Sequence, residues 1–205
     1  MSTTFISNMP HLLESIKLEN GHWHQLPYHE QRLQRAQLEL FGEVTIRDLA
    51  RQIAVPDHAR RGVYKCRLRY GQEIEHIEFV PYEPRTIRTL RRVHCDTIDY
   101  SHKYADRNIL NELFAQRNGC DDVLIIKNGL VTDTSYANVI FYDGQRWVTP
   151  ATPLLRGTQR QYLLDRRIIS EQLIREQDLH AFQQFRPINA LLGTEHPAQA
   201  LANVL

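Results

Sequence analysis

Cysteine is scarce in this chain, and its pattern excludes the frameworks that cysteine usually builds. Cys66, Cys95 and Cys120 are odd in number among 205 residues and show neither CxxC spacing nor pairing with histidines. A disulfide scaffold and a zinc site are therefore not expected. A chain of this length buries enough surface to fold without either of them. We interpret the three residues as reduced thiols of a cytoplasmic protein.

Long apolar runs and an excess of one charge are also missing. No segment approaches the run of about 18 apolar residues that a membrane helix needs. Residues 1–10, MSTTFISNMP, lack the basic and apolar regions of an export signal. The 25 Lys plus Arg are balanced by 24 Asp plus Glu, for a net charge of +1. We therefore expect no membrane and no nucleic-acid partner.

Histidines gather near the start of the chain without the other ligands of a metal site. His22 and His24 alternate along a strand-like run, and His29 follows, but no acid or thiol stands at ligand spacing. We expect no metal.

Lysine is rare as well, because only four of the 25 basic residues are lysines. Arginine stays charged, whereas a desolvated lysine can lose its proton and act as a nucleophile. Lys17 and Lys65 lie in strand-like runs that should be half exposed, and Lys127 precedes a turn where it should be solvated. Lys103 lies between a predicted strand and a predicted helix, where functional residues concentrate. Its position leaves both a catalytic lysine and an ordinary surface cation open.

Glycine-containing turns between apolar runs predict four β-hairpins, three of them at Asn-Gly or Asp-Gly, and helical spacing predicts four helices. The hairpins are expected over residues 12–26, 64–80, 122–133 and 138–150. The helices are expected over residues 28–41, 45–54, 104–117 and 158–174, the second of them opening on a Thr45/Asp48 capping box. Helices inserted between hairpins indicate an α+β fold with mostly antiparallel sheets.

A proline- and arginine-rich segment predicts a division into two domains. PYEPRTIRTLRRV, residues 81–93, has two prolines and a dense run of arginines. We predict an N-terminal α+β domain over residues 1–84, a linker over 85–93 and a C-terminal α+β domain over 94–205. Both domains are within the usual range of domain sizes.

Three further segments carry side chains suited to an anionic or cationic ligand. TDTSYAN, residues 132–138, is either a solvated connection or a place where the Asp133 carboxylate pairs with a cationic nitrogen. Gly157 and Thr158 precede a helical pattern, which allows a phosphate site or an ordinary capped helix. Arg32, early in another helix, is either a solvated charge or a bidentate phosphate ligand.

The order of these segments resembles the class IV aminotransferase family, the pyridoxal-phosphate enzymes of fold type IV. ESIKLENG, YHEQRLQRA, SHKYADRN, NGLVTDTSYAN and TPATPLLRGTQR follow one another. The pattern G-x-V-T-[acid]-x-x-x-x-N-[apolar], followed by TP…L…G-x-x-R, is the specific part of the resemblance. It extends from about residue 12 to about residue 192. The family includes branched-chain and D-amino acid aminotransferases and aminodeoxychorismate lyase.

The resemblance implies a role for each matching residue. Lys103 corresponds to the lysine that forms a Schiff base with pyridoxal 5'-phosphate and serves as the catalytic residue. Asp133, where the family usually has glutamate, corresponds to the acid that pairs with the pyridine nitrogen. Arg32 corresponds to the arginine that binds the cofactor phosphate. Further implied cofactor-binding residues are Gly157, Thr158, Gln159, Asn189 and Ala190.

The resemblance also implies two α+β domains with the cofactor in the cleft between them, and a homodimer. We expect a pyridoxal-phosphate-dependent aminotransferase that acts on an amino acid or amino carboxylate. One alternative is an aminodeoxychorismate lyase that forms p-aminobenzoate and pyruvate. Another is a non-catalytic binding protein on the same scaffold. Arg85, Arg88 and Arg107 are the candidates for binding a substrate carboxylate.

Overall fold

The first sheet is built from two hairpins that are far apart in the sequence. In the computed structural model, which describes residues 9–205, its strands are antiparallel and follow the order β2-β1-β3-β4. The strands are β1 (Leu12–Glu19), β2 (His22–Trp23), β3 (Val63–Tyr70) and β4 (Ile74–Pro81). At the first turn, Asn20 and Gly21 have φ values of 50° and 78°, the left-handed geometry that Asn-Gly favours. The predicted hairpins over 12–26 and 64–80 are confirmed.

Helix α1 (Leu26–Phe41) packs against one face of this sheet, and its predicted range of 28–41 is confirmed. Because strand residues alternate between faces, the side chains of Leu12, Ile16 and Leu68 form one core with Leu33 of the helix. The helix ends at Gly42, whose φ of 80° allows its N–H to bond the Leu38 carbonyl at 3.1 Å.

The helix predicted over residues 45–54 is wrong for its first half. Only α2 (Leu49–Gln52) forms, and Asp48 adopts a left-handed φ of 57°. The Thr45 hydroxyl does not cap a helix, because it donates to the Gln72 carbonyl and accepts a hydrogen bond from the Gln37 amide. A short 3-10 turn, η1 (Asp57–Ala59), follows.

The remaining strands form two sheets that share a core. One of these two contains β5 (Leu90–His94), β6 (Asp122–Lys127) and β7 (Leu130–Thr134). The second has the order β10-β9-β8-β11-β12, formed by β8 (Asn138–Tyr142), β9 (Trp147–Pro150), β10 (Ile169–Gln172), β11 (Gln184–Ile188) and β12 (Gln199–Ala200). The hairpins predicted over 122–133 and 138–150 are confirmed. Two strand pairs, β5 with β6 and β9 with β10, are parallel.

The helices in this part of the chain are shorter than the sequence pattern predicts. Helix α3 (Asn108–Ala115) lies within the predicted range of 104–117. Helix α4 (Thr158–Asp165) begins where predicted but ends early, so the predicted helix over 158–174 is wrong beyond residue 165. Arg167 takes a left-handed φ of 56°, and the following residues pair with β9 as β10. Two 3-10 turns, η2 (Glu176–Ala181) and η3 (Leu201–Asn203), complete the chain.

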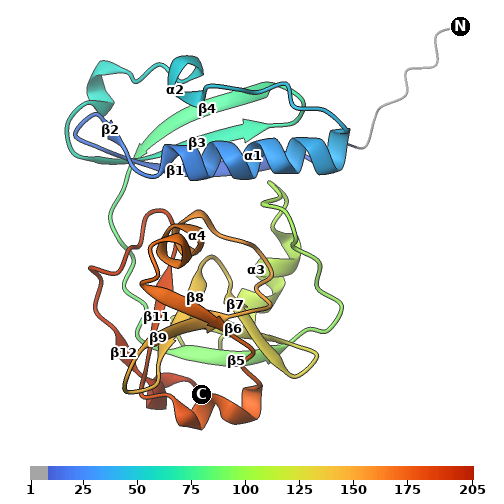
Figure 1. Cartoon of the computed structure of the whole chain (residues 1–205), viewed down its shortest axis with the longest axis vertical. Coiled ribbons are helices and arrows are strands. Elements are labelled where there is room, and N and C mark those ends of the chain that lie inside the picture. The colour runs from blue at the N-terminus through green and yellow to red at the C-terminus, as the bar shows by residue number, and fades with distance from the viewer. Residues whose placement is uncertain (1–8) are drawn as a thin grey trace, which may run out of the picture.

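Figure 1 shows two halves, one above the other, with α1 running across the lower part of the upper half. The two halves also contact each other through α1 and α4, since the Tyr28 hydroxyl donates to Asp165 at 3.0 Å. The predicted linker, 85–93, overlaps β5, and the domain bounds of 1–84 and 94–205 stay a prediction. Most of the segment screened for an export signal, residues 1–8, lies outside the described residues. No helix within residues 9–205 is long and apolar enough to cross a membrane.

Candidate active site

A cavity of about 410 Å³ lies between the two halves and receives side chains from both. Its volume falls within the range of about 300–1,000 Å³ that is typical of ligand pockets. The residues singled out by sequence that line it are Arg32, Lys103, Arg107, Asp133, Gly157, Thr158, Asn189 and Ala190. Arg85 lines it as well, whereas Gln159 is buried outside the lining and Arg88 is exposed elsewhere. Their roles stay predictions, but the fold brings most of them to one place.

The backbone around Lys103 is hydrogen-bonded to the start of β1 and to the residue before it. The Lys103 carbonyl accepts the Leu13 N–H at 2.9 Å, and the Ala105 N–H donates to the His11 carbonyl at 2.8 Å. The Lys103 side chain is accessible only in part. The burial of its amine, aided by the positive charges of Arg32 and Arg107, lowers the pKa of Lys103 from 10.5 to about 7, against the opposing charge of Glu14. The amine is therefore about half unprotonated at neutral pH, as a nucleophile or base requires.

The lowered pKa of Lys103 predicts an unusual reactivity towards acylating reagents. The unprotonated amine is the reactive form, so in the cofactor-free protein we expect acetylation of Lys103 by trace acetic anhydride to be half-maximal near pH 7. An ordinary lysine reaches this point only near pH 10.4. Mass spectrometry of the labelled peptides measures the midpoint for Lys103 and the midpoints for the other lysines. A Lys103 midpoint above about pH 9.5 would contradict the proposed environment of the amine.

Arg32 is positioned by a buried carboxylate that the sequence analysis missed. Glu14 is fully buried on β1 and accepts the Arg32 Nε–H at 2.9 Å, together with a second bond from Nη2. The His29 Nδ1 lies 2.6 Å from the same carboxylate, and its Nε2 lies 3.5 Å from the Thr158 hydroxyl. The network therefore connects β1 and α1 to the start of α4 in the other half.

The Glu14 carboxylate stays ionised despite its burial. Burial alone would raise its pKa, but the charge of Arg32 and the hydrogen bond from His29 outweigh that effect and lower the pKa to about 2. The sequence did contain a pattern that indicates a buried acid at this position. Leu12, Ile16 and Leu18 occupy the buried face of β1, and an acid at position 14 shares that face by alternation.

Asp133 lies on β7 with both carboxylate oxygens held. The Asn138 amide donates to Oδ1 at 2.7 Å, and the Leu155 N–H donates to Oδ2 at 2.9 Å. Burial raises the pKa of Asp133 to about 6, and these hydrogen bonds offset only part of that effect. Interpreting residues 132–138 as a solvated connection is wrong, because most of the segment is buried. The Asp133 carboxylate is therefore fixed in place at the cavity.

The loop before α4 passes close to Asn138. A Cβ atom at Gly157 would lie 2.0 Å from the Asn138 Oδ1, so only glycine fits there. The following residue, Thr158, is the first of α4 and lines the cavity. Its neighbour Gln159 instead accepts a hydrogen bond from Gln25 of the other half. The Asn189 side chain accepts the N–H groups of the turn that follows it, and its backbone bonds that of Leu192. Asn189 and Ala190 both line the cavity.

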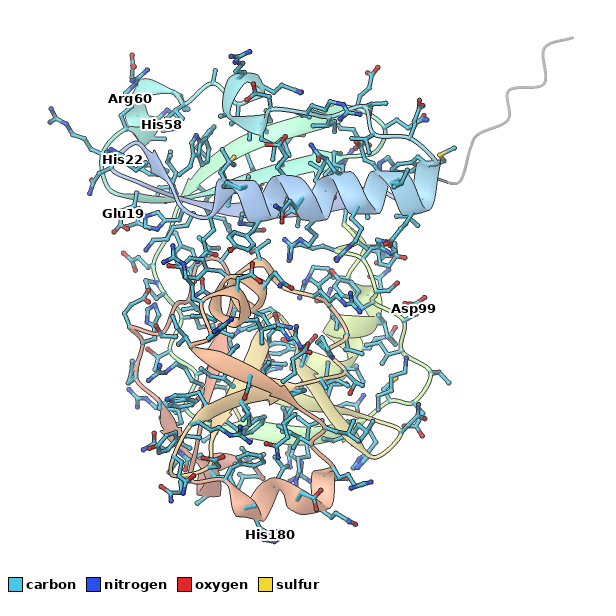
Figure 2. The ribbon with its side chains drawn as sticks, in the orientation of Figure 1. Glu19, His22, His58, Arg60, Asp99 and His180 are labelled. Atoms are coloured by element: carbon cyan, nitrogen blue, oxygen red, sulfur yellow. The ribbon has the colours of Figure 1, made fainter. Side chains whose placement is uncertain are left out.

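The other lysines and the histidines occupy different surroundings. Lys17 pairs with Glu19 at 3.1 Å. The expectation that Lys127 is solvated is wrong, because it is half-buried and donates to the Ile98 carbonyl at 2.6 Å. His22 and Glu19 lie at the left edge of the first half in Figure 2. Within residues 9–205, no group of three or more His, Cys, Asp or Glu side chains could hold a metal ion.

Comparison with known proteins identifies similar chains. The family model described as "Amino-transferase class IV" matches residues 11–194. An uncharacterised protein of Haemophilus influenzae is 41% identical over 184 residues, which are 89% of this chain and 98% of that protein. A solved structure from Haemophilus somnus 129pt, described as a candidate 4-amino-4-deoxychorismate lyase, is 38% identical with a TM-score of 0.84, and the match covers 90% of this chain and 97% of that one.

A more distant structure has the same fold. It is the pyridoxal-phosphate-bound form of a hypothetical aminotransferase from Mycobacterium tuberculosis, 19% identical with a TM-score of 0.74. The match covers 91% of this chain and 79% of that chain.

Proposed function

The chain belongs to the class IV aminotransferase family, and we propose on this premise that it binds pyridoxal phosphate in the cavity and transaminates an amino acid or amino carboxylate. The observation that carries the proposal is the pairing of Lys103, whose pKa is about 7, with a buried carboxylate at Asp133 on the same cavity. The homodimer implied by the family is part of the proposal.

The groups around the cavity fit this cofactor. The Lys103 amine supplies the group that holds it covalently, and the Asp133 carboxylate supplies a partner for its ring nitrogen. Arg32, positioned by Glu14, and Thr158, at the start of α4, supply groups for its phosphate. Bound there, the cofactor withdraws electrons from the α-carbon of the substrate.

The residues of the chain then carry out the proton chemistry. Lys103, released by the incoming substrate amine, takes the proton from the substrate α-carbon as general base, which requires a pKa near the working pH. Lys103 would then return the proton to another carbon, and water would release the 2-oxo acid product. The reverse sequence with an acceptor 2-oxo acid would complete the transamination. Asp133, fixed by Asn138 and Leu155, keeps one negative charge facing the ring nitrogen throughout.

The proposal predicts a coloured protein with one modified lysine. Protein loaded with pyridoxal phosphate is expected to absorb visible light, lose that absorbance on treatment with borohydride, and carry the reduced label on the peptide that contains Lys103. The measurement is absorbance followed by peptide mass spectrometry. A protein that pyridoxal phosphate cannot colour, or a label confined to Lys17 or Lys127, would contradict the proposal.

A second candidate function is C–O bond cleavage that releases p-aminobenzoate and pyruvate. It is favoured by the 38% identity to the Haemophilus somnus protein, described as a candidate 4-amino-4-deoxychorismate lyase. The loaded protein distinguishes the two functions. Formation of p-aminobenzoate and pyruvate from aminodeoxychorismate supports the lyase, and amino transfer to a 2-oxo acid supports the transaminase.

A further inference from the structure

The first sheet presents two cationic side chains to the cavity. Lys65 and Arg67 lie two residues apart on β3, so their side chains leave the same face of the sheet. Arg67 faces Ser15 of β1 in the strand register, and all three side chains line the cavity. This is the face opposite the α1 core, which receives Cys66 and Leu68.

The cavity has more positive charge than its carboxylates balance. Glu14 compensates Arg32, and Asp133 is the one acid among the described residues that line the cavity. Arg85 and Arg107 donate to backbone carbonyls, of Asp121 and Ser135. Once the cofactor phosphate is assigned to Arg32 and its ring nitrogen to Asp133, positive charge remains for the substrate.

The cations of the first sheet are free to bind an anion. Lys65 forms no ion pair in the part of the chain that the structure describes, whereas Lys17 pairs with Glu19. Arg67 contacts Glu78 at 2.7 Å, but both side chains are about 40% exposed, at 45% and 37%, so that pair contributes little and can exchange.

The remaining cations lie in two places. Arg107, just before α3, belongs to the second half, and Lys65 and Arg67 belong to the first. The charges of Arg107 and Arg67 both reach the Lys103 amine, since each contributes to lowering its pKa after the larger effect of burial. A ligand with one carboxylate neutralises the cations in one of these two places and leaves the positive charge of the other without a partner.

We propose that Lys65 and Arg67 bind a second carboxylate of the substrate, remote from the reacting amine, so that the enzyme selects dicarboxylates. This inference rests on the proposed function and deepens it by naming the substrate class. Arg107 serves the carboxylate nearer the reacting carbon. The preference holds for either a transaminase or a lyase, because it concerns binding and not the bond that breaks.

The test compares two ligands that differ by one carboxylate. Titration calorimetry of the pyridoxal-phosphate-loaded protein measures the dissociation constants of 2-oxoglutarate and 2-oxobutyrate. We expect 2-oxoglutarate to bind about 10- to 100-fold more tightly, the effect of a hydrogen-bonded charge pair. In Lys65→Met and in Arg67→Met, this ratio should fall by about tenfold, while the affinity for 2-oxobutyrate stays within about twofold.

Two matched variants serve as controls. Lys17→Met removes a lysine from the neighbouring strand and should leave the ratio unchanged. Lys65→Arg keeps the charge and should preserve most of the preference. An unchanged ratio in Lys65→Met and Arg67→Met overturns the inference, provided circular dichroism matches the wild type. Weakened pyridoxal-phosphate binding with an unchanged ratio also overturns it, and assigns the two cations to the cofactor phosphate.

The outcomes separate this inference from the proposed function. If borohydride labels Lys103 but the variants keep the wild-type ratio, only the dicarboxylate site is wrong. If Lys103 takes no label, the proposed function is wrong. The ratio measured on the cofactor-free protein then decides the anion site by itself.

Discussion

Lys103→Ala is expected to lower turnover by about 100- to 10,000-fold, the usual contribution of a positioned general base. The proposed covalent attachment of the cofactor is lost with it, so the larger value is the better expectation. The measurement is turnover under saturating substrate, together with visible absorbance. The matched control is Lys17→Ala, which removes a lysine paired with Glu19 outside the cavity and should keep full activity. Full turnover in Lys103→Ala would exclude the proposed mechanism.

The same variant has a readout that does not depend on activity. The folded-state pKa of Lys103 is about 7, while the unfolded chain keeps that proton up to about pH 10.4. Between these values the unfolded state binds more protons, so the free energy of unfolding of the cofactor-free protein rises with pH. Well below pH 7 both states are protonated and the slope vanishes. Lys103→Ala should lack this rise, as urea titrations at several pH values measure.

Glu14→Gln is expected to lower the free energy of unfolding by about 3–5 kcal/mol. Glutamine keeps the shape of the side chain, but Arg32 loses its carboxylate in a buried site, and the uncompensated charge is costly there. Urea denaturation measures the change, which should appear as a lower midpoint at an unchanged slope. The control is Glu19→Gln on the same strand, since Glu19 lies at the surface with Lys17 and His24.

The pH dependence distinguishes a charge effect at Glu14 from a packing effect. The folded-state pKa of Glu14, about 2, is below the ordinary value of 4.5, so its stabilisation is present above pH 4.5 and lost as the pH falls towards 2. The difference in stability between wild type and Glu14→Gln should therefore shrink across this interval. A difference that stays constant from pH 6 to pH 2 would mean that the carboxylate charge is not what stabilises the fold.

The hairpins could be predicted because their turns are local. Asn-Gly at positions 20–21 and 128–129 tolerates positive φ whatever surrounds it, and both turns form as expected. The helix predicted beyond Asp165 failed because its partner is distant in the sequence. Residues 169–172 pair with β9, and a strand partner outweighs a weak helical pattern. The Thr45 capping box failed likewise, since Gln37 and Gln72 bind its hydroxyl.

The candidate site could be predicted only in part, because its local motifs are visible in the sequence and its long-range contacts are not. Lys103, Asp133 and Arg32 stand in recognisable motifs, and the fold brings them to one cavity. Glu14 was missed, because alternation places an acid on a strand face but does not say which side chain meets it. Lys65 was interpreted as a half-exposed strand residue. Its place in the cavity depends on how the first sheet meets the second half, which no local pattern contains.

One consequence follows from the hydrogen bond between Leu13 and Lys103. Leu13 is next to Glu14, and Glu14 holds Arg32. The Lys103 backbone and the Arg32 guanidinium are therefore both bound by two adjacent residues of β1. Under the proposed function, β1 would therefore position both groups that hold the cofactor, although Lys103 comes about 90 residues later in the chain. In this arrangement β1 sets the positions of the two cationic groups, and the second half supplies Asp133 and Thr158 around them.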